Sequence, residues 1–141
     1  MPRLNFKRIL LGGLIAGVLL NITEGFFNVV LFGKEMEASF KAMNLPPLGA
    51  GAMFFFNLWG FAQGLISVWL YAVLRDRFGA GPRTAVLAGL VVWVLACAYP
   101  NLSFGFMHMG SWRIVGIGLI WTLIEAPAAT VLGGWLYREE A

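Results

Sequence analysis

The stretch that decides the fold is residues 19–28, LLNITEGFFN. It lies within a run, Ile9 to Phe32, that contains no Lys, Arg or Asp but carries Glu24 near its middle. A run of this length and apolarity is typical of a helix that crosses a membrane, which needs roughly 20 residues. A carboxyl group is costly to keep in lipid. We therefore expect Glu24 to face other helices.

The composition of the whole chain supports a membrane protein. Of its 141 residues, 60% are hydrophobic and 12% are charged, whereas a soluble domain carries roughly 25% charged residues. Four apolar segments are apparent, at about 9–33, 49–74, 84–101 and 112–137. Only helices satisfy their own backbone polar groups in lipid without closing a barrel. The sequence thus predicts an all-α fold, an integral membrane four-helix bundle, as a single domain over residues 1–141.

The basic residues predict the orientation of these spans. One side of the membrane would hold seven of them, namely Arg3, Lys7, Arg8, Arg75, Arg77, Arg83 and Arg138, and the other side Lys34, Lys41 and Arg113. Positively charged loops stay in the cytoplasm. We expect a multi-pass protein of the bacterial inner membrane with both termini cytoplasmic, a retained first span, and Trp135 and Tyr137 in an aromatic belt.

Three segments have less regular patterns. Residues 33–51, GKEMEASFKAMNLPPLGAG, mix both charges, so we expect a solvated connector, with a short surface helix ended by Pro46-Pro47 as the alternative. Pro100 should end the regular part of the third span, with residues 102–109 as an irregular extension. Pro127 predicts a kink in the fourth span, which serves packing or frees a carbonyl near Glu125.

Small and polar residues share one face of each predicted helix. At 100° per residue the first face holds Gly13, Gly17, Asn21, Glu24 and Asn28; the second Asn57, Gly60, Gly64, Ser67 and Tyr71, with Gln63 at its edge; the third Ala85, Ala88, Gly89, Ala96 and Tyr99; and the fourth Gly118, Thr122, Glu125, Ala129 and Gly133. Small residues let helices approach closely in lipid. We expect a tight bundle with a partly polar centre.

Two acids lie at similar depth in that centre, Glu24 and Glu125. No Lys or Arg lies within the spans to neutralise them, so we expect both to be protonated at neutral pH. They form either a proton or cation site between the first and fourth helices or a protonated pair that joins helices through Asn and Thr neighbours. The predicted intramembrane polar site comprises Asn21, Glu24, Asn28, Asn57, Gln63, Ser67, Thr122 and Glu125.

Other chemistries have weaker support in the sequence. The single cysteine, Cys97, excludes an internal disulfide, and the single histidine, His108, excludes a bis-histidine haem and a Glu-x-x-His iron site. Met107-His108-Met109 offers thioether and imidazole groups, ligands that suit Cu(I), so a copper-binding loop is an alternative interpretation. Ser39, Ser67, Ser103 and Ser111 lack a second histidine to build on. We expect no cofactor, no metal in the bundle and no nucleic acid partner.

Three family resemblances can be stated. Asn21-x-x-Glu24 resembles the motif of the four-span membrane-associated eicosanoid and glutathione metabolism family, which carries it on the second helix after arginines that hold glutathione. Here it is on the first helix, after Val18, Leu19 and Leu20. A glutamate on the first of four helices is similar to small multidrug-resistance transporters, which implies proton and cation exchange at Glu24; this chain is longer and lacks their later tryptophan motif.

The segments LFGKEMEASFKA (residues 31–42), Arg-Phe-Gly (residues 77–79) and GGWLYRE (residues 133–139) resemble small uncharacterised four-span bacterial membrane proteins. That resemblance implies the four-helix fold and no activity. Our best functional prediction is a small proton- or cation-linked transporter, with the lipid bilayer and a homo-oligomer or larger membrane complex as partners. The alternatives are an accessory or scaffold subunit of such a complex and a lipid-facing membrane enzyme.

Overall fold

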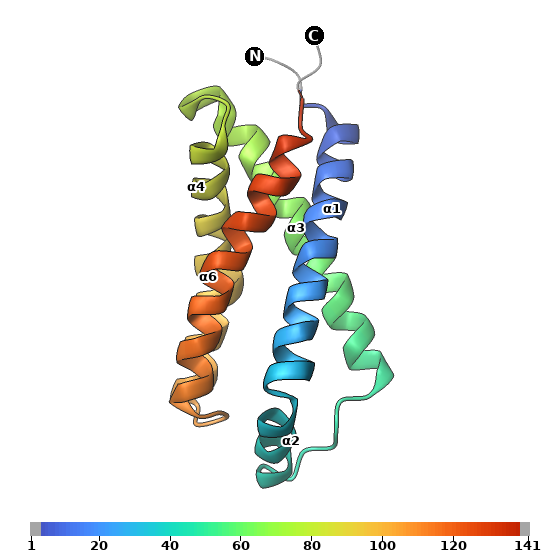
Figure 1. Cartoon of the computed structure of the whole chain (residues 1–141), viewed down its shortest axis with the longest axis vertical. Coiled ribbons are helices and arrows are strands. Elements are labelled where there is room, and N and C mark those ends of the chain that lie inside the picture. The colour runs from blue at the N-terminus through green and yellow to red at the C-terminus, as the bar shows by residue number, and fades with distance from the viewer. Residues whose placement is uncertain (1–3, 139–141) are drawn as a thin grey trace.

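Four long helical spans run up and down beside one another in the computed structural model, which describes residues 4–138 (Figure 1). Arg3, one of the basic residues that predict the orientation, lies outside this range. Each span is long and apolar enough to cross a membrane, so the chain is a multi-pass membrane protein. The first and last described residues lie at the same end of the bundle, called here the terminal end (Figure 1).

The spans are built from helices that two wider π-helical turns interrupt. The first span is α1 (Phe6–Gly25) continued by η1 (Phe26–Leu31), and the second is α3 (Ala50–Phe78). The third comprises α4 (Pro82–Trp93), η2 (Val94–Ala98) and α5 (Tyr99–Phe106), and the fourth is α6 (Trp112–Trp135). The all-α four-helix prediction is therefore confirmed, with span ends that shift by up to five residues.

The third span is longer than predicted because Pro100 does not end it. Pro100 lies in the first turn of α5, where a missing N–H costs little. The wide turn η2 precedes it, and the Tyr99 N–H donates to the Val94 carbonyl five residues back. The extra residue in this turn rotates the rest of the span about the helix axis. Tyr99, predicted on the contact face, is consequently 72% exposed.

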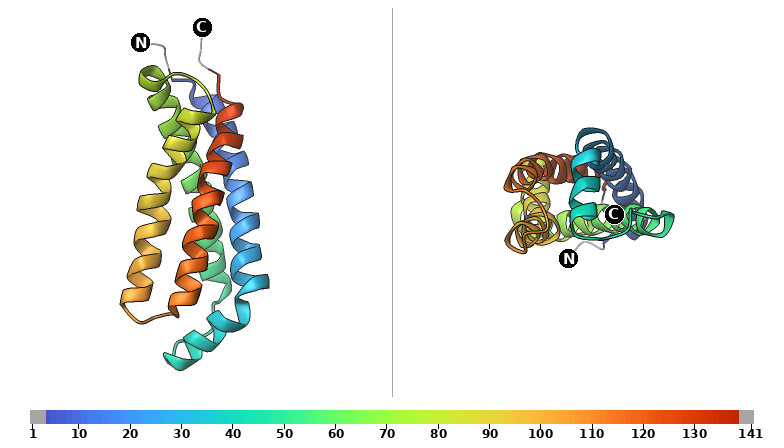
Figure 2. Two further views of the ribbon diagram at one scale, coloured as in Figure 1. Left: turned by 60° about the vertical axis from the view of Figure 1, so that its left-hand side comes forward. Right: turned by 90° about the horizontal axis from the view of Figure 1, so that it is seen from below.

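The connector predicted for residues 33–51 is wrong over its first half. It contains the helix α2 (Gly33–Ala42). Glu35 lies in the first turn of this helix and Lys41 in its last turn, so both charges interact favourably with the helix dipole. The helix ends before the prolines, since Asn44 adopts a left-handed conformation with φ of 55°. Seen from below, α2 lies across the end of the bundle opposite the termini (Figure 2).

Backbone contacts between glycines hold the terminal half of the bundle together. A Cβ atom added at Gly64 would lie 2.9 Å from the Gly17 Cα and closer still to the Gly13 carbonyl, so α1 and α3 touch through their main chains. Gly12 and Gly133 meet in the same way between α1 and α6. We call these five residues the glycine clamp. Its members on the predicted faces confirm that small residues set the helix contacts.

Two further contacts concern Tyr137, which was predicted in an aromatic belt, and Pro127, which was predicted either to serve packing or to free a carbonyl. Tyr137 is only 4% exposed, because its ring packs edge-on against Tyr71 at 6.3 Å and lies under the Arg75 guanidinium. It is therefore not part of a lipid-facing belt, whereas Trp135 is 81% exposed and its place in such a belt stays a prediction. Pro127 packs against α4 at Gly89, which supports a packing role for this proline.

The clamp makes a prediction about stability. Gly64→Leu should destabilise the protein by about 3 kcal/mol, the upper part of the range for overpacked cores, because the added side chain meets backbone atoms that cannot move aside. Gly17→Leu should act similarly. Thermal unfolding in detergent measures the effect. Gly116→Leu is the control, since a Cβ there meets nothing. Equal stability of all three variants would show that the clamp does not hold the bundle.

Candidate intramembrane polar site

A cavity of about 600 Å³ occupies the half of the bundle nearer α2. It begins where the glycine clamp ends, because α3 diverges from α6 on that side (Figure 1). The cavity brings together all but one of the predicted polar residues, namely Asn21, Glu24, Asn28, Asn57, Gln63, Thr122 and Glu125. Ser67 does not line it; it lies further along α3, in the tightly packed half, and is 2% exposed.

Glu24 of α1 and Glu125 of α6 meet across the cavity. Both line it, and their carboxyl groups are close enough to interact electrostatically. The Glu24 Oε2 accepts a hydrogen bond of 2.8 Å from the Asn28 amide, whereas its Oε1 is buried and finds no donor in the described chain. Lys, Arg and His are absent from the residues that line the cavity in the described part of the chain. The two acids therefore face each other without a cation.

Thr23 connects Glu125 to the helix α1. Its hydroxyl lies 2.8 Å from the Leu19 carbonyl, to which it can donate, and in contact with the Glu125 Oε1. A hydroxyl has only one proton to give. When that proton goes to Leu19, the contact with Glu125 is a hydrogen bond only if Glu125 carries a proton. When it goes to Glu125, the carboxyl group accepts it, so Thr23 joins Glu125 to α1 in either protonation state. Thr23 was not among the predicted site residues, although its place beside Glu24 was visible in the sequence.

The amide side chains are held by backbone carbonyls. Asn21 donates from its Nδ2 to the Asn57 carbonyl at 3.1 Å, and Asn57 donates to the Met53 carbonyl at 2.8 Å. Gly60 makes room for Asn21, because a Cβ there would lie 2.8 Å from the Asn21 Cγ. The side-chain oxygens of both asparagines accept no hydrogen bond within residues 4–138. They remain available to a ligand or to water.

The cavity wall opposite α1 comes from the third and fourth spans. Gln63 donates to the Cys97 Sγ at 3.5 Å, and Thr122 accepts from the Trp93 indole at 3.0 Å. Asn101 also lines the cavity, beside Gly118. Asn101 was not predicted as a site residue. A helical wheel at 100° per residue assumes an unbroken α-helix, whereas the wider turn η2 rotates the residues that follow it about the helix axis. The proline at position 100 was the signal that could have indicated such a turn.

The segment Met107-His108-Met109, which the sequence offers as a set of copper ligands, lies outside the helices. Met107 and His108 lie in the turn after α5, and Met107 is 68% exposed. Over residues 4–138 there is no group of three or more His, Cys, Asp or Glu side chains placed to hold a metal ion.

Comparisons with protein-family models, with curated proteins and with solved structures found no match to this chain.

The carboxyl pair predicts an infrared signature. Near neutral pH the parent protein should show the carbonyl band of a protonated carboxyl group, because two anions side by side in an apolar medium repel each other strongly. Glu24→Gln and Glu125→Gln should each change this band in difference spectra and leave the fold intact. Glu37→Gln, which alters an exposed acid on α2, is the control. Carboxylate bands alone in the parent would show that both acids are ionised.

Proposed function

We propose that the protein is a small transporter that couples the movement of protons to that of a cation, with Glu24 and Glu125 as its binding site. The observation that carries this proposal is the pair of facing carboxyl groups in a cavity, one with a buried oxygen that has no donor in the described chain. Ionisable residues within membrane spans are costly, and they commonly mark ion pathways and proton relays.

The size of the cavity favours transport over a purely structural role. Acids that only join helices need no empty space around them, whereas these acids border a volume of about 600 Å³. This volume is within the range of small-molecule sites, roughly 300–1,000 Å³. The cavity can therefore hold a hydrated ion or an organic cation next to the carboxyl pair.

The chemistry of exchange is a consequence of charge balance. With a proton on the pair, the site carries at most one negative charge. A cation that binds there without releasing a proton gains less attraction than one that meets two carboxylates. Binding of the cation is therefore linked to proton release, and protonation is linked to cation release. The free asparagine oxygens next to the acids supply further neutral ligands.

Transport can be tested in vesicles with a short series of cations. Proteoliposomes loaded with a pH indicator and acidified inside are exposed to sodium, potassium or benzylammonium, which span bare ions and an aromatic amine. The parent should release protons with at least one of them. Glu24→Gln and Glu125→Gln should abolish that release, because Gln keeps the shape but holds no titrating proton, and Glu37→Gln should retain it.

The same experiment distinguishes the alternative of an accessory subunit. If no cation in the series makes the parent release protons more than Glu24→Gln does, proton-coupled movement of these ions is wrong. Copurification in mild detergent then shows whether the chain occurs with a larger complex, as an accessory role requires, or as a homo-oligomer.

We also propose an inner-membrane orientation with both termini in the cytoplasm, from the excess of basic residues at the terminal end. A reporter active only in the cytoplasm should work when fused after Ala141, which lies outside the described residues, or inserted into residues 75–83. It should fail between Lys34 and Leu48. Reporter activity at that last position would reverse the orientation.

A further inference from the structure

The helix α2 covers the end of the cavity opposite the termini. Met36 and Phe40 lie one turn apart on α2 and both line the cavity, as does Leu48 in the segment after the helix. The charged residues Glu37 and Lys41, on an adjacent face of α2, are exposed. The helix therefore separates the polar cavity from the aqueous phase at this end of the bundle.

Few contacts hold α2 in this position. Within the described chain its backbone lies close to that of η1, the turn that leads into it, and side chains make its contact with α6: Met36 packs in the cluster that includes Ile114, and Glu35 pairs with Arg113. Both of its connections leave helical geometry: Phe32 before it has φ of −122°, and Asn44 after it has φ of 55°. A helix joined to the bundle in this way can move as a unit about its two ends.

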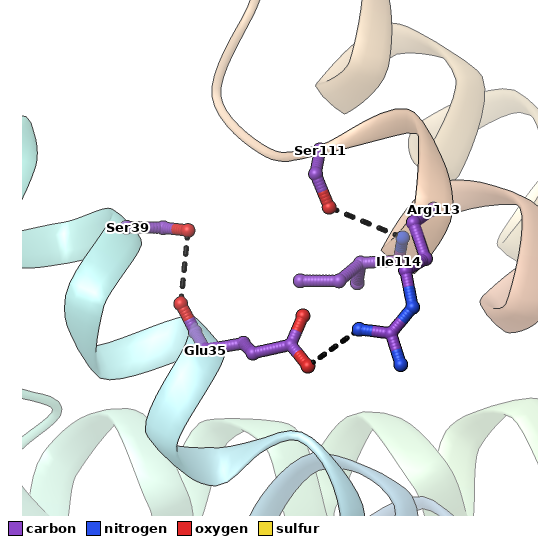
Figure 3. A network of polar contacts seen from close by, with 5 residues as sticks. All are labelled: Glu35, Ser39, Ser111, Arg113 and Ile114. Carbon is purple, nitrogen blue, oxygen red and sulfur yellow. Dashed lines mark hydrogen bonds and ion pairs between the residues drawn. The ribbon is translucent and has the colours of Figure 1, made fainter.

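One ion pair joins α2 to α6. The Arg113 Nη1 donates to the Glu35 Oε1 at 2.8 Å (Figure 3). The same guanidinium lies 5.8 Å from the centre of the Phe32 ring. The two charged side chains are 66% and 42% exposed, so solvent and salt weaken the pair. Ser111, beside Arg113, accepts from the Ile114 N–H and so fixes the start of α6 from which Arg113 extends (Figure 3).

We propose that α2 is a lid over the cavity and that the Glu35–Arg113 ion pair is its latch. In the closed state the latch holds Met36 and Phe40 over the cavity. When the pair separates, α2 moves away and the cavity opens to water at the α2 end. This inference concerns access and goes beyond the proposed function, because it holds whichever ligand enters.

The chain contains its own reporter for this movement. Cys97 is the single cysteine of the sequence, lines the cavity and is 8% exposed. A charged, water-soluble maleimide does not dissolve in the bilayer and can reach this thiol only through an aqueous opening. Its rate of reaction with Cys97 therefore measures how often the lid is open.

The test compares labelling rates of the protein in vesicles. Arg113→Ala and Glu35→Ala should each label about two- to fivefold faster than the parent, the change that loss of one exposed ion pair produces. The exchanged pair Glu35→Arg with Arg113→Glu should label at close to the parental rate. High salt should speed the parent but not Arg113→Ala. Glu37→Ala, which removes an acid of the same helix outside the ion pair, should match the parent.

Two outcomes would overturn the lid. Equal rates in the parent, both single variants and the exchanged pair would show that the latch does not control access. Faster labelling that the exchanged pair fails to reverse would show that the substitutions loosen the bundle and do not open a lid, and thermal unfolding of the same samples would then reveal the loss of stability. Neither outcome bears on proton release in vesicles, so the transport proposal is tested separately.

Discussion

The contact between backbones at the glycine clamp is the constraint on which the rest of the molecule depends. Lipid tails are as apolar as leucine, so helices in a membrane gain little from simple hydrophobic contact and associate through close packing. Gly17 and Gly64 bring α1 and α3 together, and Gly12 and Gly133 join α1 to α6. Because these contacts all lie in the terminal half, the other half of the bundle can diverge and hold a cavity.

The polar residues lie where that divergence begins. In the clamp half the buried Thr130 is satisfied by its own helix, because it donates to the Ala126 carbonyl at 2.7 Å. In the open half polar groups of different spans border one cavity, where Glu24 and Glu125 are close enough to interact electrostatically. The two π-helical turns border this half, η1 directly after Glu24 and Gly25, and η2 at Cys97. Turns of this kind are frequent at functional sites in helices.

Much of this arrangement could be predicted from the sequence because helical periodicity places residues on faces. The spacing of Gly13, Gly17 and Gly64 placed small residues on the contact faces of the first two spans, and the two glutamates of the spans indicated one shared polar centre. The wheel assumes an unbroken α-helix, however. It misplaced Tyr99 and missed Asn101 because η2 adds one residue to a turn. Tyr137 was misplaced because its partners Tyr71 and Arg75 come from another span.

The position of α2 over the cavity could not be predicted from the sequence, for a different reason. Alternating charges over residues 34–41 fit either a solvated connector or a surface helix, and nothing local decides between them. The deciding contacts are tertiary: Met36 packs with Phe27, Phe32 and Ile114, and Glu35 pairs with Arg113 across 78 positions of the chain. Such long-range partners are not encoded in a period or a motif.

The central claim is that Glu24 and Glu125 form one site, and a double-mutant cycle tests it most directly. The free energy of unfolding in detergent is measured for the parent, Glu24→Gln, Glu125→Gln and the double variant. Groups in direct contact should show a coupling energy of about 0.5–3 kcal/mol. Effects that add to within about 0.3–0.5 kcal/mol would show that the two carboxyl groups act independently, and would contradict the account.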